Sequence, residues 1–313
     1  VIKYGMTRGL VLGLDVVMAD GSVISSMKKI IKDNSGYDLK QMFIGSEGTL
    51  GIVTKALFKL EELPTSRNSA FIGFEDFGKI VKFLKSANKK LAGNLSGFEI
   101  LWKDTYRTLT SEVARQKAPL PDNYDYYILM ETLGGDAKQD KESLQELLQE
   151  ATQKQIILDA VMSHSDSDCD WFWSIRENVD VMNSTARYQQ SFDISLPIGS
   201  IDSYVKQVRA SLLRELNLHI CYAFGHLGDG NIHFVVGKET NDKELREQIN
   251  NIVYRPLKDL QGSVSAEHGI GIDKKRWLGI SRSQEEIALM KTLKQALDPK
   301  GILNPGRVVD RFS

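Results

Sequence analysis

The chain has 313 residues, which is long enough to bury a substantial core and to form two domains. Its 40 basic and 41 acidic residues give a formal net charge of −1 without a long run of like charge, so neither a nucleic-acid-binding surface nor a polybasic membrane anchor is expected. No apolar stretch is long enough to span a bilayer, and we expect no signal peptide in this segment. Because Cys169 and Cys221 are the only cysteines, we expect no disulfide framework and a cytoplasmic location, with peripheral membrane contact or a mitochondrial location as alternatives.

The first 64 residues predict one lobe of a domain. Strands are expected over 10–18 and 52–60, and Asp20-Gly21 is typical of a hairpin turn after the first of them. The chain opens at Val1 without an initiator methionine and enters a strand almost at once. We therefore expect that residues precede it.

A glycine-rich segment, residues 44–54, lies within this lobe. Gly45, Gly48 and Gly51 permit tight turns and let backbone N–H groups approach a phosphate or a ring closely. Their spacing matches neither a Walker loop nor GxGxxG, so an ordinary turn is the commoner interpretation of this segment taken alone.

Residues 65–282 predict a second domain, which begins after a linker containing Pro64. The hydrophobic periodicity indicates β-α-β-β-α-β twice, separated by a helix around 171–182. The first copy is expected at 70–74, 76–91, 98–102, 126–131, 140–153 and 156–162, and the second at 191–196, 201–216, 219–225, 232–237, 242–260 and 263–266. The fold class is therefore predicted as α+β, with two ferredoxin-like halves sharing an antiparallel sheet.

Three of the five histidines lie beside glycine turns, two in the second copy and one just after it. The segment 223–233 predicts a hairpin that lets His226 and His233 face each other, and Glu267 and His268 follow in 265–271. Two imidazoles and one carboxylate form a three-ligand set that leaves coordination positions open for water or substrate. The alternative is that these histidines only cap loops. We favour a metal site formed by His226 and His233 of the hairpin and by Glu267, which is predicted on the strand that closes the sheet.

The last segment, residues 283–313, predicts a helix and an extended tail. The helix begins with a capping box, Ser283 with Glu286, and stops before Pro299. The tail from Ile302 to Gly306 reads by itself as a simple C-terminal strap.

Together, these motifs resemble one family along the whole chain: the FAD-linked oxidases of the vanillyl-alcohol-oxidase (PCMH) type, in the branch of D-2-hydroxyacid dehydrogenases that includes D-lactate, glycolate and D-2-hydroxyglutarate enzymes. The motifs occur in the family's order. They are the segments 4–21, 45–54, 225–233, 265–271 and 298–306.

The resemblance implies a partial PCMH-type FAD-binding domain (1–64), a cap domain with a metal site (65–282) and a tail returning to the flavin domain (283–313). It implies that a D-2-hydroxyacid gives its α-hydrogen to FAD while zinc or manganese on His226, His233 and Glu267 assists loss of the hydroxyl proton. The flavin is expected along Gly45, Glu47, Gly48, Thr49, Gly51, Ile52 and Asn304.

The same resemblance assigns roles to two further residues. His268 is expected to act as general base, with orientation of the neighbouring metal ligand as the alternative. Arg176 is expected to bind the substrate carboxylate through its guanidinium fork, with a helix-surface ion pair as the alternative.

The sequence differs from the family pattern at positions that affect the expected substrate and the expected binding of the cofactor. Where D-2-hydroxyglutarate dehydrogenases carry threonine, lysine and asparagine, this chain has Asp180, Ser191 and Val235. A smaller or differently substituted 2-hydroxyacid, such as D-lactate, is therefore expected. The family's N-terminal flavin lobe has no counterpart in the sequence, so we expect these 313 residues alone to retain FAD weakly and to be inactive.

Two other classes of function remain open. One is a metal-dependent hydrolase built on the same three ligands, and the other is a noncatalytic subunit of a flavoprotein complex. The electron acceptor could be a quinone, a cytochrome or an electron-transfer flavoprotein, and a homodimer is compatible with the sequence.

Overall fold

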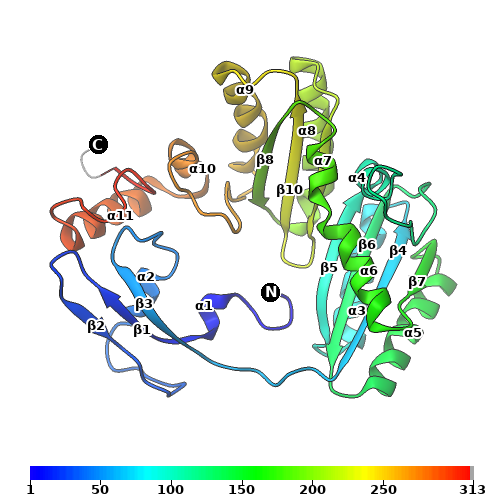
Figure 1. Cartoon of the computed structure of the whole chain (residues 1–313), viewed down its shortest axis with the longest axis horizontal. Coiled ribbons are helices and arrows are strands. Elements are labelled where there is room, and N and C mark those ends of the chain that lie inside the picture. The colour runs from blue at the N-terminus through cyan, green and yellow to red at the C-terminus, as the bar shows by residue number, and fades with distance from the viewer. Residues whose placement is uncertain (311–313) are drawn as a thin grey trace. The chain divides into compact units, whose positions relative to one another are not determined.

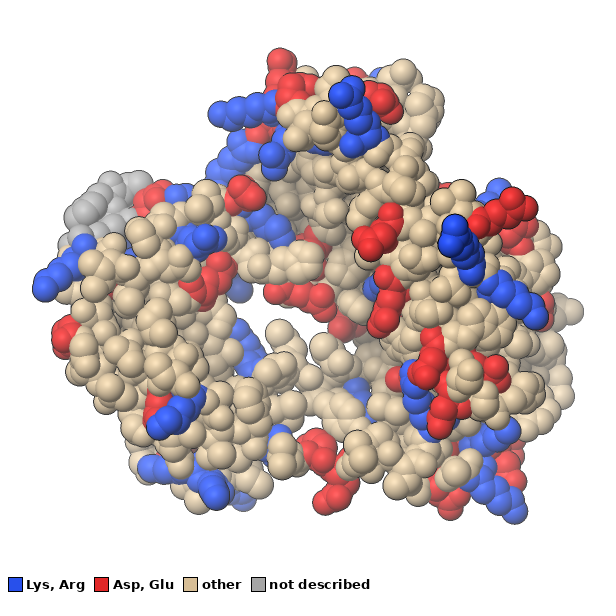
Figure 2. All heavy atoms as spheres, viewed as in Figure 1, with Lys and Arg blue, Asp and Glu red and all other residues tan. Residues whose placement is uncertain are grey.

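The computed structural model describes residues 1–310, which form two compact units (Figure 1). The larger unit comprises Val1–Tyr4 and Leu63–Gln261, and the smaller comprises Gly5–Glu62 with the chain from Gly262 onward. By their contacts, residues 262–282, which the sequence places with the cap domain, group with the smaller unit. On the face shown in Figure 2, basic and acidic side chains are interspersed. No helix among the described residues is both long and apolar enough to cross a membrane.

The larger unit is built on a seven-stranded antiparallel sheet of order β7-β4-β6-β5-β9-β10-β8. The four strands β7-β4-β6-β5, with helices α3 and α5, form the first predicted ferredoxin-like half. The strands are β4 (Ser66–Phe74), β5 (Leu95–Trp102), β6 (Tyr126–Gly134), β7 (Asp159–Met162), β8 (Tyr188–Ser195), β9 (Cys221–His226) and β10 (Asn231–Lys238).

The helices of this half begin where an aspartate caps them. Asp76 accepts a hydrogen bond from the Lys79 N–H before α3 (Phe77–Lys90), as expected. The helix predicted from 140 instead begins three residues earlier, as α5 (Ala137–Gln153), because Asp136 accepts from the N–H groups of 138 and 139. Asp140 lies inside this helix.

The second half lacks its predicted last strand. It contains β8, α8 (Ile201–Leu216), β9, β10 and α9 (Lys243–Tyr254), after which Pro256 ends the α-helix and a 3-10 turn, η2 (Arg255–Leu257), follows. The strand predicted over 263–266 is wrong, since only an isolated bridge forms at Ser263. The Ser263 hydroxyl donates to the Ser265 carbonyl and accepts from the Ser265 N–H, satisfying groups that a ladder would use. Glu267 therefore lies on a loop.

The two faces of the sheet are covered by different helices. Phe83 of α3 packs its ring against Phe74 and Phe98 on one face. The opposite face packs against α4 (Lys103–Leu109), α6 (Asp166–Glu177) and α7 (Val179–Asn183), which lie in front of it in Figure 1. The single helix expected around 171–182 is divided into α6 and α7 at Asn178, whose ψ of 49° is not helical. The apolar cluster on this face includes Phe71, Leu101, Leu129, Phe172, Ile175, Met182, Tyr222, Phe224 and Val235.

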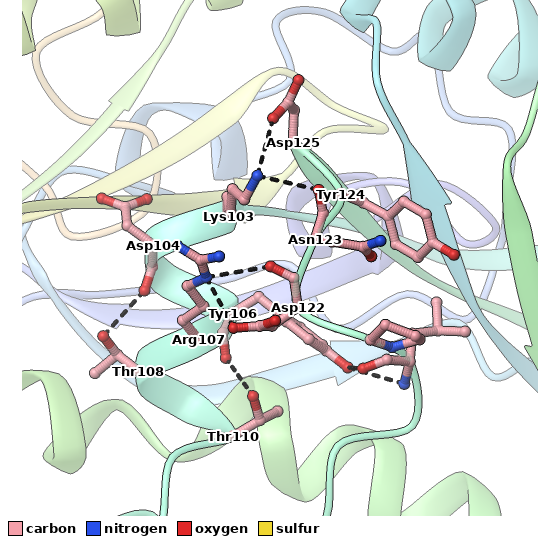
Figure 3. Close-up of polar contacts among 12 residues, drawn as sticks. Lys103, Asp104, Tyr106, Arg107, Thr108, Thr110, Asp122, Asn123, Tyr124 and Asp125 are labelled. Carbon is pink, nitrogen blue, oxygen red and sulfur yellow. Dashed lines mark hydrogen bonds and ion pairs between the residues drawn. The ribbon is translucent and has the colours of Figure 1, made fainter.

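Polar contacts fix α4 to the loop that follows it, as Figure 3 shows. Arg107 donates from Nε to Asp122 Oδ2 at 2.9 Å, and Lys103 donates to the carbonyl of Asn123 at 3.0 Å. The buried Tyr106 hydroxyl donates to the carbonyl of Leu120 at 2.8 Å. This network holds α4 against the sheet face that also carries the candidate site.

The smaller unit contains a three-stranded antiparallel sheet of order β2-β1-β3. The hairpin predicted at Asp20-Gly21 forms, with Gly21 at φ +88°. The predicted capping box at Ser283 and Glu286 opens α11, which ends at Leu297 as expected. The elements are α1 (Thr7–Leu10), β1 (Val11–Val17), β2 (Val23–Ser25), α2 (Lys40–Phe43), β3 (Ile52–Phe58), η3 (Lys275–Trp277), α10 (Leu278–Ser281) and α11 (Gln284–Leu297), while η1 (Ile198–Ser200) belongs to the larger unit.

Candidate active site

The candidate site of the larger unit lies where its two halves join. Glu99 of β5 is opposite His226 of β9, and His226 is in turn opposite Asn231 of β10. His233 follows two residues after Asn231. Because opposite residues, and residues two apart along a strand, share one face of a sheet, these four side chains emerge on the same face.

Glu99 connects the first histidine to the predicted substrate arginine. Its side chain is buried, with 3% of the residue exposed. Oε1 lies 2.7 Å from His226 Nδ1, and Oε2 accepts a hydrogen bond from Arg176 Nε at 2.8 Å. A carboxylate has no hydrogen to donate, so His226 Nδ1 carries the hydrogen of this bond. The ring's basic lone pair is then on Nε2, the nitrogen suited to a metal.

His233 packs against the same group of side chains. Its ring centroid is 5.3 Å from that of His226 at an interplanar angle of 87°, and Phe224 lies 5.3 Å away on another side. Burial lowers the pKa of His233 to about 4. The charge of Arg176 and the neighbouring His226 ring act in the same direction, against the opposing Asp193 and Glu99. At neutral pH His233 is therefore an uncharged imidazole, the form that binds metals.

Arg176 is buried, which is unusual for a helix arginine. It extends from the last turn of α6, only 6% exposed, and its guanidinium lies 4.8 Å above the Phe224 ring. Nε is the only one of its nitrogens with a hydrogen bond or ion pair to another residue in the range 1–310. The two terminal nitrogens are the ones that form a fork for a carboxylate.

The side chain of Asn231 indicates whether the cluster of Glu99, His226, His233 and Arg176 is suited to a ligand. It is 3% exposed, yet neither its amide nitrogen nor its amide oxygen has a hydrogen-bond partner among the described residues. Buried polar groups are almost always satisfied, so an orphaned amide beside two histidines indicates a position completed by a ligand. The imidazoles, the arginine and this amide fit a metal-bound hydroxyacid.

Sequence reasoning missed Glu99, Asp193 and Asn231. Asp193 is fully buried on β8, with Oδ1 3.8 Å from His233 Nδ1. The available signal was an acid inside an otherwise apolar strand, as in Phe98-Glu99-Ile100 and Phe192-Asp193-Ile194. A charge at such a position is expected only when it is paired.

The other two predicted residues, Glu267 and His268, belong to the smaller unit and are exposed. Their loop is anchored at its glycine end. The carboxylate of Glu47 accepts hydrogen bonds from the N–H groups of Ile270 at 2.6 Å and Gly271 at 2.8 Å. A side chain at Gly269, which has φ +79°, would meet this carboxylate at 2.7 Å. Glu47 thus ties the glycine-rich segment to the loop that carries the predicted ligand and base.

The predicted flavin residues converge within the smaller unit. Asn304 donates its amide hydrogen to the carbonyl of Glu47, and Arg307 donates from Nε to Asn304 Oδ1 at 2.8 Å. Gly48, at φ +70°, has Asn304 and Ile52 as its nearest neighbours, and Ile52 is 48% exposed. A glycine between these side chains leaves the backbone accessible to a flat ring or a phosphate, so the residues fit a flavin.

Three other predicted residues of this loop shape its backbone and packing. The Thr49 hydroxyl donates to the Ser46 carbonyl at 2.6 Å. A side chain on Gly51 would approach Val16 Cγ1 to 2.5 Å, so this glycine is required by the core, and Gly45 takes φ +81° at the turn.

A buried lysine holds the C-terminal tail to this loop. Lys294 of α11 donates to the carbonyls of Thr49 at 2.9 Å and Leu303 at 2.6 Å, and pairs with Asp298 at 2.5 Å. Burial opposes ionisation of Asp298, but hydrogen bonds from Lys294 and from the Leu303 and Ile302 N–H groups lower its pKa below the ordinary value. We call these contacts of Lys294 with Thr49, Leu303 and Asp298 the Lys294 clamp; they hold the tail so that Asn304 lies next to Glu47.

Replacing Lys294 by methionine is expected to destabilise the smaller unit by about 3 kcal/mol, because it leaves Asp298 buried and unpaired. Because the pKa of Asp298 is lowered in the folded protein, the stabilisation from its pairing with Lys294 is lost in the wild type as pH falls below about 4. The difference in the free energy of unfolding between wild type and variant should therefore become smaller below that pH. Urea unfolding at pH 7 and at about pH 2 measures both effects. Lys206→Met removes an i,i+4 pair with Asp202 whose lysine is 68% exposed, and should change stability by less than about 0.5 kcal/mol. Equal effects of the two substitutions would contradict the clamp.

A cavity of about 750 Å³ lies at the other end of β5 and β9, lined by Trp102 and Cys221 among others. Arg209 beside it pairs with Asp104 at 2.8 Å, and Lys103 pairs with Asp125, so its positive charges are offset by acids. Burial raises the pKa of Cys221 to about 12, which keeps it a thiol. In this cavity Arg209 and Lys103 are therefore paired with acids, and Cys221 is not a thiolate.

Comparisons with known proteins identify the family. Residues 63–308 match the family "FAD linked oxidases, C-terminal domain". The chain is 38% identical over 309 residues to a mitochondrial D-2-hydroxyglutarate dehydrogenase of Arabidopsis thaliana, covering 98% of this chain and 55% of the relative. It is 34% identical to a D-2-hydroxyglutarate–pyruvate transhydrogenase of Saccharomyces cerevisiae, covering 98% and 64%. The chain thus spans little more than half the length of such relatives.

Solved structures show the same fold at low sequence identity. Substrate-bound p-cresol methylhydroxylase superposes with a TM-score of 0.72 at 16% identity, covering 98% of this chain and 67% of that one. A 4-ethylphenol oxidase from Gulosibacter chungangensis gives 0.69 at 15% identity, covering 98% and 67%. The expected α+β fold of the PCMH type is thereby confirmed. As the family match covers most of its length, this chain belongs to the FAD-linked oxidases, within their C-terminal domain family.

Proposed function

We propose that this chain binds a small D-2-hydroxyacid for an FAD-dependent dehydrogenase. The observation that carries the proposal is the cluster at the join of the two sheet halves, in which Glu99 links His226 to Arg176 beside His233 and an unsatisfied Asn231. A carboxylate-binding fork and two metal-binding imidazoles meet the needs of a 2-hydroxyacid, which presents a carboxylate and a hydroxyl on adjacent carbons.

Each residue has a distinct part in this proposal. Arg176 binds the substrate carboxylate through its terminal nitrogens, and Asn231 hydrogen-bonds the bound acid. His226, His233 and Glu267 would hold a zinc or manganese ion, which when bound acidifies the substrate hydroxyl. His268 accepts the hydroxyl proton.

The flavin part of the proposal concerns the smaller unit. FAD, when bound, accepts the α-hydrogen of the substrate as hydride. The loop with Gly45, Gly48 and Gly51, closed by Asn304, would lie along it. A quinone, a cytochrome or an electron-transfer flavoprotein would be the electron acceptor.

The side chains around Arg176 favour a substrate with one carboxylate. Its Nε is already shared with Glu99, and Asp193 adds a second buried acid. Two residues beyond His233 on the same face, Val235 is 5% exposed and part of the apolar cluster. A second carboxylate would therefore meet acids and apolar groups, so we propose a D-lactate-sized substrate in preference to D-2-hydroxyglutarate.

Anaerobic stopped-flow absorbance tests the reaction class. Flavin-loaded, metal-replete protein that contains this chain is mixed with a panel of D- and L-2-hydroxyacids. We expect D-lactate to bleach the flavin with a kcat/KM at least about tenfold above that of D-2-hydroxyglutarate, since one uncompensated charge costs at least about 1.4 kcal/mol. Faster reduction by the dicarboxylate would overturn the substrate assignment. A flavin that no acid reduces would favour the hydrolase or the noncatalytic subunit.

A further inference from the structure

Glu99 is the only carboxylate found to contact both the predicted substrate arginine and a predicted metal ligand within residues 1–310. We propose that Glu99 is a positioning residue that sets the tautomer of His226 and the orientation of Arg176 at the same time. This inference rests on the metal and carboxylate roles proposed above. It adds a residue that touches neither the substrate nor the metal.

The first step of the argument is the geometry at His226. A neutral imidazole carries its hydrogen on either Nδ1 or Nε2, and its partner decides which. The contact of 2.7 Å between Glu99 Oε1 and His226 Nδ1 selects the Nδ1–H form. Coordination through Nε2 with a carboxylate on Nδ1–H is a recurrent arrangement, because the carboxylate fixes the ring and raises its basicity.

The second step concerns Arg176. The other oxygen of the same carboxylate accepts from Arg176 Nε at 2.8 Å, and Phe224 supports the guanidinium from one face at 4.8 Å. A planar guanidinium held at Nε and on one face has little rotational freedom left. Its terminal nitrogens are therefore presented in a fixed direction.

The third step compares Glu99 with a glutamate that has only a structural role. A purely structural glutamate needs two hydrogen-bond donors, but those donors need not be predicted site residues, as His226 and Arg176 are. Glu131 provides the comparison on the same sheet face. It accepts from Arg67 Nε and from Trp173 Nε1, each at 2.8 Å, and is 9% exposed. Glu131 thus repeats the chemistry of Glu99, a carboxylate between an arginine Nε and a ring N–H, without a predicted ligand.

Glu99→Gln is the test variant and Glu131→Gln the matched control. Glutamine keeps the shape but has one acceptor oxygen. Because Arg176 Nε always carries a hydrogen, the amide oxygen faces Arg176, and the amide hydrogens face His226 Nδ1, which must then be an acceptor. Nitrogen-15 NMR of the His226 ring reports the tautomer in metal-free protein. Titration with Mn²⁺ alone, followed by electron paramagnetic resonance of the free ion, reports metal affinity.

We expect Nδ1–H at His226 in the wild type and in Glu131→Gln, and its loss in Glu99→Gln. Mn²⁺ affinity should fall about 10- to 100-fold in Glu99→Gln and stay within about twofold in Glu131→Gln. If Glu99→Gln does not fold, the double variant Glu99→Gln/Arg176→Met removes both charges of the pair and is measured in its place.

Two results would overturn the inference: an unchanged Nδ1–H tautomer in Glu99→Gln, or an equal loss of Mn²⁺ affinity in both glutamine variants. Wild-type protein that does not bind Mn²⁺ would instead overturn the proposed metal site, and the metal role of Glu99 with it. The tautomer measured without metal distinguishes the two failures.

Discussion

Replacing His226 by alanine is expected to slow substrate-dependent flavin reduction about a thousandfold. Loss of one of two histidine ligands removes Lewis-acid assistance of several kcal/mol, and each 1.4 kcal/mol corresponds to a factor of ten in rate. Stability should fall by only about 1–2 kcal/mol, because the ring is 33% exposed and its removal deprives Glu99 of one donor.

The measurement is anaerobic stopped-flow absorbance of flavin-loaded, metal-replete protein with its preferred D-2-hydroxyacid. His219→Ala is the matched control, since His219 is an exposed histidine just before the same strand. It should stay within about twofold of wild type. Chelation of metal should slow the wild type and leave His226→Ala unchanged. Retention of the wild-type rate in His226→Ala would refute the metal role.

Replacing Arg176 by methionine is expected to have the largest effect on stability, about 3–5 kcal/mol by urea unfolding. The side chains of Arg176 and Glu99 are 8% and 4% exposed, so removing one leaves an uncompensated buried charge. Arg67→Met is the control, because Arg67 donates to Glu131 with the same 2.8 Å geometry but is 31% exposed. Screening by solvent should reduce its cost to about 1 kcal/mol or less.

The substrate role of Arg176 is separable from its structural role. Arg176→Lys keeps the charge near Glu99 but loses the fork, so KM for the hydroxyacid should rise at least about tenfold in a protein that still folds. The double variant Glu99→Gln/Arg176→Met should recover most of the lost stability without recovering activity. A lysine variant with wild-type KM would show that Arg176 serves the fold alone.

The difference between Arg67 and Arg176 illustrates what the sequence leaves undecided. Each arginine donates its Nε to a glutamate on a central strand, at equal distance. Arg176 extends from helix α6 and is buried, whereas Arg67 lies on strand β4 and is 31% exposed as a side chain. Local residue preference does not encode this difference in burial. Glu99 was missed for the same reason: its partners are 77 and 127 residues away.

The sequence by itself determined the periodic elements, the hairpin of His226 and His233, and the capping box at Ser283, because these depend on residues only two to eight apart. It also determined the family, since several long motifs occur in a fixed order. It predicted a closing strand over 263–266, where serine side chains instead bind the local backbone. Only the tertiary structure decided that Glu99 bridges Arg176 and His226, that Asn231 is buried without a partner, and that Lys294 holds the tail to the glycine-rich loop. Each of these depends on side chains brought together by strand order and helix packing, which no local pattern encodes.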